Sequence, residues 1–171
     1  MWNNTNTPLA YFISFRTYGT WLHGDKRGSI DRFNNAYGQP YIPQNIPLHI
    51  YRQSLLKTKP LILNRRQRQL VDEEIRETCR IRGWTLLAVN ARTNHVHTVV
   101  IAQDKKPELV LNAFKANATR KLRQKGFWGH RFSPWAFKGS KRKLWNERSI
   151  ERAIDYVLYG QGDEPPDFDE D

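Results

Sequence analysis

Two periodic patterns of hydrophobic and polar residues run along the chain, and they predict its strands and helices. Three segments rich in aromatic and β-branched residues have the pattern of strands, namely 9–18, 84–92 and 95–102. Three longer segments repeat apolar residues at helical spacing, namely about 65–82, 107–125 and 147–159. Two further segments are suited to a short helix and to a short strand with loops, namely 48–58 and 127–145.

Residues with strong positional preferences mark where the predicted helices begin and end. Asn64 is suited to cap the helix over 65–82, and Gly83 is suited to stop it. Pro107 suits the first turn of the next helix. Asn146 suits the N-cap of the last helix, which Gly160 ends. The order of these elements predicts an α+β fold: a ferredoxin-like sandwich whose antiparallel sheet carries its helices on one face.

Two segments do not follow either pattern. Residues 19–47 are rich in glycine and proline, which predicts a long loop insertion. Residues 163–171 contain six acidic residues, no basic residue and two prolines, which predicts a disordered acidic tail. We therefore expect one domain over 1–162, followed by this tail.

Composition excludes several classes of protein. The chain has 171 residues and a single cysteine, Cys79, which excludes a disulfide framework and a multi-cysteine zinc site. Its apolar runs are shorter than the roughly 18 residues that a membrane-spanning helix needs. The N-terminal residues lack the pattern of a signal peptide. We therefore expect a cytoplasmic protein without a membrane segment.

Charge changes this picture once the tail is considered separately. The chain carries 28 basic and 17 acidic residues, with a formal net charge of +11. Without the six acidic residues of the tail, the 28 basic residues face only 11 acidic ones. Such an excess favours a polyanionic partner, most often nucleic acid.

The basic residues gather in the segment 115–148, where aromatic residues are interleaved with them. Basic side chains neutralise phosphates, and aromatic rings stack on unpaired bases, although about half of these rings are expected in the core. Nine basic residues are the candidates for contact with DNA: Lys115, Arg120, Lys121, Arg123, Arg131, Lys138, Lys141, Arg142 and Lys143.

Two histidines in a predicted strand form the sharpest chemical feature. His95 and His97 are two residues apart, so their side chains point to the same side of the strand. Two imidazoles placed in this way can bind one divalent ion, and the spacing alone is equally compatible with two histidines that only complete a sheet. A His-x-His pair gives two ligands, so a metal site needs others from elsewhere.

A tyrosine in the last predicted helix forms the second feature. Ile150, Ala153, Ile154 and Val157 are part of an apolar stripe on this helix, and Tyr156 lies just off that stripe. Such a tyrosine is either a surface residue or a functional hydroxyl that can attack a phosphodiester.

Together these residues resemble a known family. Asn94-His95-Val96-His97 resembles the His-hydrophobic-His (HUH) motif of single-tyrosine DNA transposases, and residues 153–161 resemble their nucleophile helix. The opening strand and the basic helix come in the family's order, so the resemblance covers most of residues 9–161. It is greatest to the small insertion-sequence transposases and to the REP-associated tyrosine transposases, which are bacterial.

The resemblance implies a chemistry and a set of roles. It implies that His95 and His97 bind Mg²⁺ or Mn²⁺ and that Tyr156 attacks DNA, leaving a 5′-phosphotyrosine and a free 3′-OH. The family usually has a polar metal ligand one turn after the tyrosine, where this chain has Gly160, so Gln161 is the candidate third ligand. Tyr159 is the alternative nucleophile.

The resemblance also implies a substrate and a setting. Residues 1–162 would form a catalytic domain of the HUH-endonuclease type that binds single-stranded, hairpin or palindromic repeat DNA. It would act as a monomer or a homodimer in the bacterial cytoplasm, associated with the nucleoid. Two other functions stay open: a non-catalytic module that binds single-stranded nucleic acid on a ferredoxin-like fold, and a metal phosphoesterase that uses activated water.

Overall fold

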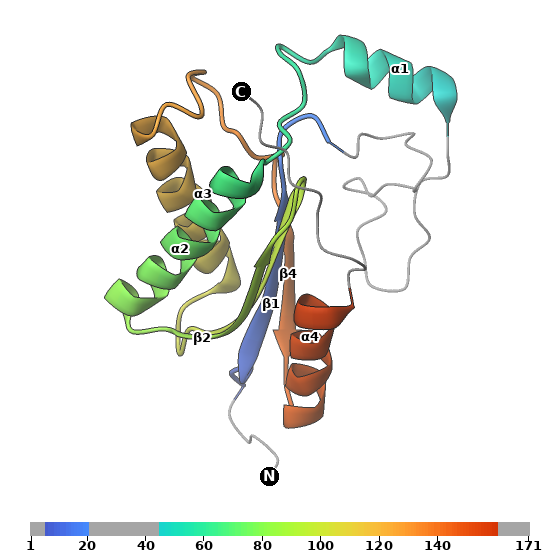
Figure 1. The fold of residues 1–171 in the computed structure, drawn as a ribbon. Helices are drawn as coiled ribbons and strands as arrows, with labels where there is room; N and C mark the ends of the chain where they lie inside the picture. The colour runs from blue at the N-terminus through green and yellow to red at the C-terminus, as the bar shows by residue number, and fades with distance from the viewer. Residues whose placement is uncertain (1–5, 21–44, 161–171) are drawn as a thin grey trace.

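The computed structural model describes residues 6–20 and 45–160, which form four strands and four helices (Figure 1). In chain order they are β1 (Ala10–Arg16), α1 (Ile46–Ser54), α2 (Arg65–Arg82), β2 (Thr85–Ala91), β3 (His95–Ile101), α3 (Pro107–Gln124), β4 (Ser140–Leu144) and α4 (Glu147–Tyr159). The expected loop insertion at 19–47 lies mostly outside the described residues, and α1 begins at its C-terminal end. The expected tail at 163–171 lies outside them entirely.

The four strands form one antiparallel sheet in the order β2-β3-β1-β4. The elements β1, α2, β2, β3, α3 and β4 follow one another as in a ferredoxin-like sandwich, which confirms the expected α+β class. β3 and β1 occupy the centre of the sheet, and β4 forms one edge. The register places Ser14 of β1 opposite His97 of β3 and opposite Ser140 of β4.

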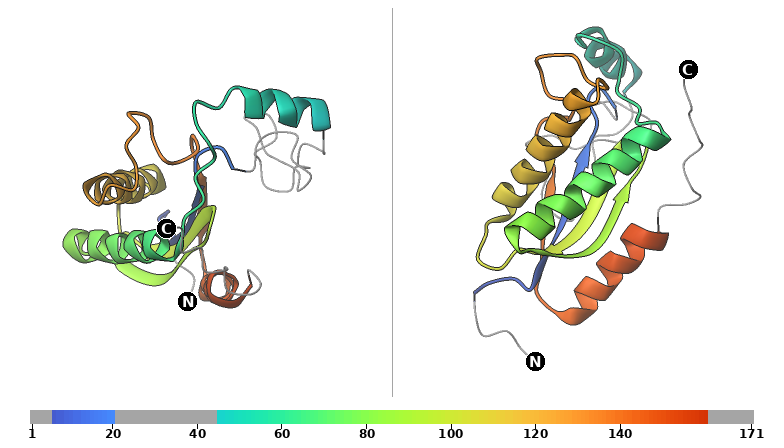
Figure 2. Two further views of the ribbon diagram at one scale, coloured as in Figure 1. Left: turned by 45° about the horizontal axis from the view of Figure 1, so that its top comes forward. Right: turned by 60° about the vertical axis from the view of Figure 1, so that its left-hand side comes forward.

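The two faces of the sheet carry different helices. α2 and α3 cover one face, where Ile13, Phe15 and Phe114 are fully buried. α4 lies on the opposite face (Figures 1 and 2). The expectation that all helices lie on one face is therefore wrong for α4.

The reason lies in the alternation of side chains along the strands. Ala88 and Val99 point away from α2 and α3, and they bury a second apolar surface with Val157 of α4. Sequence patterning showed that α4 has an apolar stripe, but the stripe does not specify which face of the sheet it covers.

Local signals place the helix ends where the sequence predicts them. Asn64 caps α2 through a reciprocal capping box with Gln67, and Gly83 ends the helix at a φ of 70°. Asn146 forms a similar box with Ser149 at the start of α4. Within residues 6–20 and 45–160, no helix is long and apolar enough to cross a membrane.

Candidate active site

The His95–His97 pair lies on the central strand β3, on the face of the sheet that α4 covers. Val96 and Thr98 are fully buried toward α2 and α3, so the alternating histidines point to the other side. The centroids of the two imidazole rings are 4.7 Å apart. The structure thus brings the two predicted metal ligands side by side.

His97 is held by two residues of the neighbouring strand β1. Ser14 Oγ lies 2.5 Å from His97 Nδ1, and the Phe12 ring stacks on the imidazole at 5.5 Å between centroids. Burial, together with the nearby charges of His95 and Arg92, lowers the pKa of His97 to about 3. His97 is therefore neutral at physiological pH, which is the form that binds a metal ion.

His95 is oriented by the residue before it. Its Nδ1 lies 2.6 Å from Asn94 Oδ1, and an amide oxygen only accepts hydrogen bonds. Nδ1 is therefore the donor in this hydrogen bond. Fixing one ring nitrogen by a hydrogen bond is how metal-binding histidines are usually oriented.

Tyr156 reaches the histidines from α4, the helix that covers their face of the sheet. Its ring centroid is 5.6 Å from that of His97 and 6.0 Å from that of Phe12. Tyr156 is 47% exposed, whereas Tyr159 is 79% exposed. Tyr156 therefore combines contact with His97 and access to solvent.

Two contacts hold α4 in this position. Val157 is fully buried against the sheet, and its carbonyl oxygen accepts a hydrogen bond of 2.9 Å from Asn90 Nδ2. Asn90 lies on β2 directly opposite His97. Sequence analysis missed Asn90 because its role depends on the register between β2 and β3, which no local pattern reveals.

The end of α4 explains why the residue one turn after Tyr156 is glycine. A Cβ atom at position 160 would lie 2.8 Å from Cδ2 and 2.9 Å from Cα of Tyr156. A side chain at Gly160 would therefore displace the tyrosine, and this position supplies no ligand. Gln161, the expected third ligand, lies outside the described residues.

The donor chemistry of the site fits a divalent cation. His95 and His97 supply imidazole nitrogens, and both rings are oriented through Nδ1. Among the described residues, no group of three or more histidine, cysteine, aspartate or glutamate side chains gathers to hold a metal ion. A cation here would need ligands beyond the two histidines.

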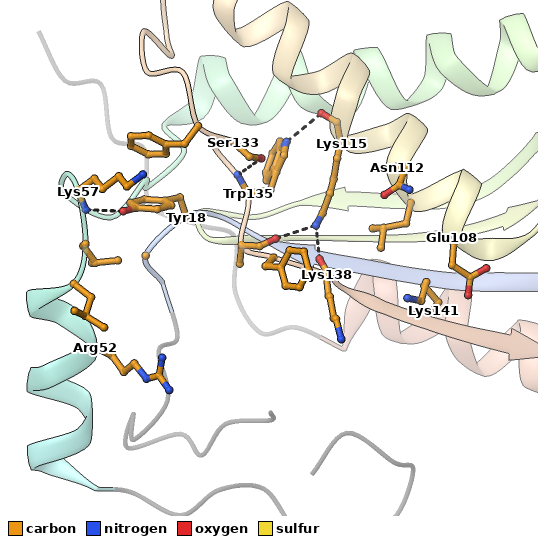
Figure 3. Close-up of a pocket in the computed structure, with 17 residues that line it drawn as sticks. Tyr18, Arg52, Lys57, Glu108, Asn112, Lys115, Ser133, Trp135, Lys138 and Lys141 are labelled. Carbon is orange, nitrogen blue, oxygen red and sulfur yellow. Dashed lines mark hydrogen bonds between the residues drawn. The ribbon is translucent and has the colours of Figure 1, made fainter. Parts of the chain in front are cut away.

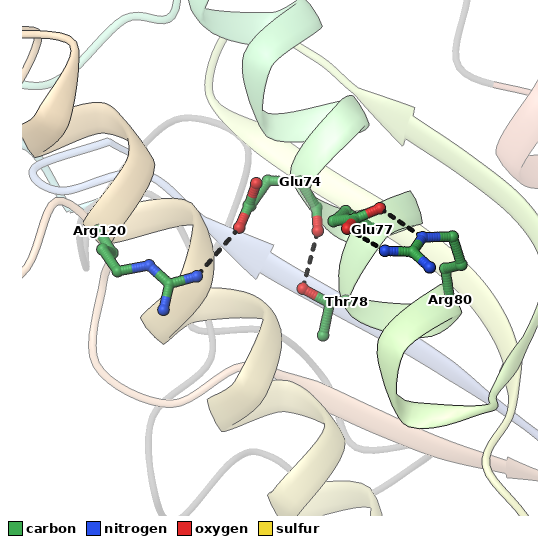
Figure 4. A network of polar contacts seen from close by, with 5 residues as sticks. All are labelled: Glu74, Glu77, Thr78, Arg80 and Arg120. Carbon is green, nitrogen blue, oxygen red and sulfur yellow. Dashed lines mark hydrogen bonds and ion pairs between the residues drawn. The ribbon is translucent and has the colours of Figure 1, made fainter.

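Three of the nine basic candidates stabilise the fold itself. Lys115 Nζ donates to the carbonyl oxygens of Ala136 and Lys138 (Figure 3). Arg120 pairs with Glu74 of α2 at 3.4 Å (Figure 4). Arg123 donates to three successive carbonyl oxygens, those of residues 130–132. These three side chains join α3 to its neighbours, which sequence analysis did not anticipate.

The other basic candidates are divided between the faces of the sheet. Arg142 lies opposite Phe12 in register and so shares the face of Tyr156. Lys141 and Lys143 alternate with it and point to the other face. The remaining candidates are on α3 and the segment before β4, namely Lys121, Arg131 and Lys138. The basic segment is therefore not one surface, and its two parts meet at the β4 edge.

About half of the aromatic rings in this segment belong to the core, as expected. Trp128 and Trp135 are buried, whereas Phe137 and Trp145 are exposed. Trp135 packs edge-on against Phe15 with 4.8 Å between ring centroids. Phe127 and Phe132 are half-buried against the core, so Phe137 and Trp145 are the most accessible rings of the segment.

The fold and the site together define a class of protein: an antiparallel α+β domain in which a histidine pair faces a tyrosine. In sequence, residues 47–148 match the family described as "Transposase IS200 like". This match covers more than half of the chain, and the chain belongs to the IS200-like transposase family. The matched region includes His95 and His97 and ends before Tyr156. No curated protein matches the chain in sequence.

The solved structures that are similar to the chain include two described as transposases. One is a REP-associated tyrosine transposase bound to a REP hairpin, with a TM-score of 0.48 and 11% identity, covering 92% of this chain and 69% of that one. The other is a candidate transposase from Deinococcus radiodurans R1, with a TM-score of 0.44 and 13% identity, covering 92% of this chain and 94% of that one. The family assignment rests on the sequence match.

Proposed function

We propose that this transposase is a single-strand DNA endonuclease and strand transferase that uses Tyr156 as its nucleophile. The observation that carries the proposal is the contact between Tyr156 and His97, which lie 5.6 Å apart between ring centroids although they come from different layers of the fold. Hairpin or palindromic repeat DNA is the proposed substrate, and Lys138, Lys141 and Arg142 are proposed to contact its phosphates.

The proposed reaction is a transesterification. Tyr156 Oη attacks a backbone phosphorus, an Oη–P bond forms and the bond from phosphorus to the 3′-oxygen breaks. The tyrosine loses its proton and the leaving 3′-oxygen gains one, so protons balance. The products are a 5′-phosphotyrosine and a free 3′-OH, and attack by that hydroxyl or by another 3′-OH on the phosphotyrosine would rejoin a strand.

His95 and His97 are the residues proposed to hold a divalent cation, Mg²⁺ or Mn²⁺, with Gln161 as the proposed third ligand. When bound, the cation supplies polarisation of the scissile phosphate. The low pKa of His97, about 3, keeps this side chain neutral through the physiological range. Imidazole nitrogen suits transition-metal ions better than Mg²⁺, so we expect stronger activity with Mn²⁺.

A denaturing-gel assay tests the nucleophile. Labelled single-stranded hairpin DNA is incubated with the protein and Mn²⁺, and a covalent protein–DNA adduct is expected with the wild type. Tyr156→Phe should abolish the adduct, because a phenyl ring has no attacking oxygen. Tyr159→Phe is the matched control and should form the adduct normally. Adduct formation by Tyr156→Phe would refute the assignment.

The alternatives predict different results in the same assay. A phosphoesterase using water would cleave the DNA without an adduct, and Tyr156→Phe would cleave as well as the wild type. A non-catalytic binder would retain DNA binding but not cleave. β3 disfavours this second alternative, because it presents histidines and aliphatic side chains rather than the exposed aromatic rings of an RNA-recognition sheet.

A further inference from the structure

A hollow lies on the other side of the sheet from Tyr156. It has a volume of about 740 Å³ and is bounded by the end of α1, the first half of α3 and the segment 132–141 (Figure 3). This volume lies within the range of small-molecule sites. We call it the Phe137 pocket, after the most exposed of the large apolar side chains around it.

Positive charge is concentrated around the Phe137 pocket. Five basic side chains line it and face a single acidic one, Glu108: Arg52, Lys57, Lys115, Lys138 and Lys141. Burial, together with the charge of Lys141, lowers the pKa of Lys115 to about 8. An anion in the pocket would relieve this mutual repulsion.

Phe137 presents its ring to solvent at the mouth of the pocket. The residue is 91% exposed, so burial in the fold does not account for an aromatic side chain here. Lys138 Nζ lies 5.7 Å from the centroid of this ring, which places a cation beside an aromatic face. Lys141 lines the same hollow.

The segment that carries Phe137 is fixed from both sides. Lys115 Nζ bonds the carbonyl oxygens of Ala136 and Lys138, the residues on either side of Phe137. At Gly139 the chain approaches β1 so closely that a Cβ atom would lie 2.6 Å from the carbonyl oxygen of Ser14. The segment therefore displays its ring on a positioned backbone, which lowers the entropy cost of binding.

We propose that the Phe137 pocket binds one unpaired nucleotide of the DNA, with its base stacked on Phe137 and its phosphate held by Lys138 and Lys141. A base needs an open aromatic face and a phosphate needs donors with positive charge, and residues 137–141 of this pocket combine the two. The proposal rests on the proposed function in one respect, since it takes the ligand to be the DNA substrate. It adds a binding site on the face opposite Tyr156.

Binding to a short fluorescein-labelled oligothymidylate tests the stacking contact. The Tyr156→Phe protein is used as the parent, so that covalent products do not contribute. Adding Phe137→Ala should weaken binding roughly 5- to 100-fold, the range expected for one lost base stack. Trp145→Ala is the matched control, an exposed ring outside the pocket, and should change the affinity by less than about twofold.

Two further binding measurements identify what occupies the pocket. A fully paired duplex should bind the Phe137→Ala protein as well as the parent, because it offers no unpaired base. Lys138→Gln should reduce the slope of log affinity against log salt by about 1, as expected when one phosphate contact is lost. Unchanged oligothymidylate binding by Phe137→Ala, or an equal loss for the duplex, would overturn the proposal.

The adduct assay separates this proposal from the proposed function. Adduct formation by the wild-type protein is measured beside oligothymidylate binding by the Phe137→Ala protein. If the adduct forms but Phe137→Ala binds DNA normally, only the proposal for the Phe137 pocket fails. If no adduct forms but binding depends on Phe137, only the catalytic proposal fails.

Discussion

Ser14 is the residue that links the histidine pair to the rest of the sheet. Its hydroxyl lies 2.5 Å from His97 Nδ1, so it fixes the orientation of the ring. Nothing in the sequence around Ser14 marks it, because its partner is 83 positions away along the chain.

We expect Ser14→Ala to weaken binding of Mn²⁺ roughly 10- to 100-fold, as is typical when a ligand loses its supporting hydrogen bond. Isothermal titration of the protein with Mn²⁺ measures the change. Ser140→Ala is the control, because Ser140 lies opposite Ser14 in register without this contact to His97. Equal affinities for wild type and Ser14→Ala would contradict the role.

The lowered pKa of Lys115 predicts how the free energy of unfolding depends on pH. Its pKa is about 8 in the folded protein against an ordinary value of 10.5, mainly because of burial. Between these values the unfolded chain binds more protons than the folded one, so the free energy of unfolding should rise as pH increases. We expect a rise of about 1–2 kcal/mol after allowing for solvent screening of this half-buried group.

Urea unfolding at pH 8 and pH 10 measures this rise. Lys115→Met should remove Lys115's part of the rise, because it has no titrating group. Lys125→Met is the control and should retain the full rise. Lys125 is exposed and lies at the C-cap of the same helix, outside the pocket. A rise of the same size in Lys115→Met would show that other groups cause it.

At the scale of elements, α4 decides whether Tyr156 lies beside the histidine pair in the candidate active site. The helix is held beside the histidines by the buried Val157, whose carbonyl oxygen accepts a hydrogen bond of 2.9 Å from Asn90, and by further apolar packing of its stripe on the sheet. Both contacts lie next to Tyr156 in sequence or in space. The tyrosine is thus positioned by the packing of a whole helix against β2 and β3.

Asn90→Ala should therefore lower the rate of adduct formation while DNA affinity stays the same. The lost hydrogen bond should also lower the free energy of unfolding by about 1 kcal/mol. Hydrogen exchange should be faster for the backbone amides of the last turn of α4. Gln69→Ala removes a comparable amide contact, to Glu73 on the outer side of α2, and should leave the reaction unchanged. A normal reaction rate in Asn90→Ala would contradict the positioning role.

At the scale of the whole molecule, the site is assembled within one chain. His97 and Tyr156 meet across the sheet and α4 of the same chain, so a second copy is not needed to bring them together. We expect a mixture of Tyr156→Phe and His97→Ala proteins to remain inactive in the adduct assay. Restored activity would mean that two chains exchange α4. Wild-type protein at the same total concentration is the control.

The β4 edge is where the two charged faces of the molecule meet. Arg142 lies on the face of Tyr156, whereas Lys141 lines the Phe137 pocket on the other face. DNA that contacts both would pass around this edge. The split between faces replaces the single basic surface that the sequence suggested for residues 115–148.

The sequence by itself determined the strands, the helices and most of their ends. Asn64 and Gly83 act through hydrogen bonds and backbone angles within a few residues, so local patterns identify them. The same holds for the common orientation of His95 and His97, which follows from the two-residue repeat of a strand. The α+β class followed from the order of these elements.

Only the tertiary structure decided which face α4 covers, which side chains support the histidines and which basic residues remain available to DNA. Ser14, Asn90 and Lys115 act on partners far away in sequence, through strand register and helix packing. An apolar stripe on a helix indicates that the helix packs against another element, but it does not indicate which element. The physical reason is that local patterns report periodicity, whereas a site depends on distances between elements that only packing sets.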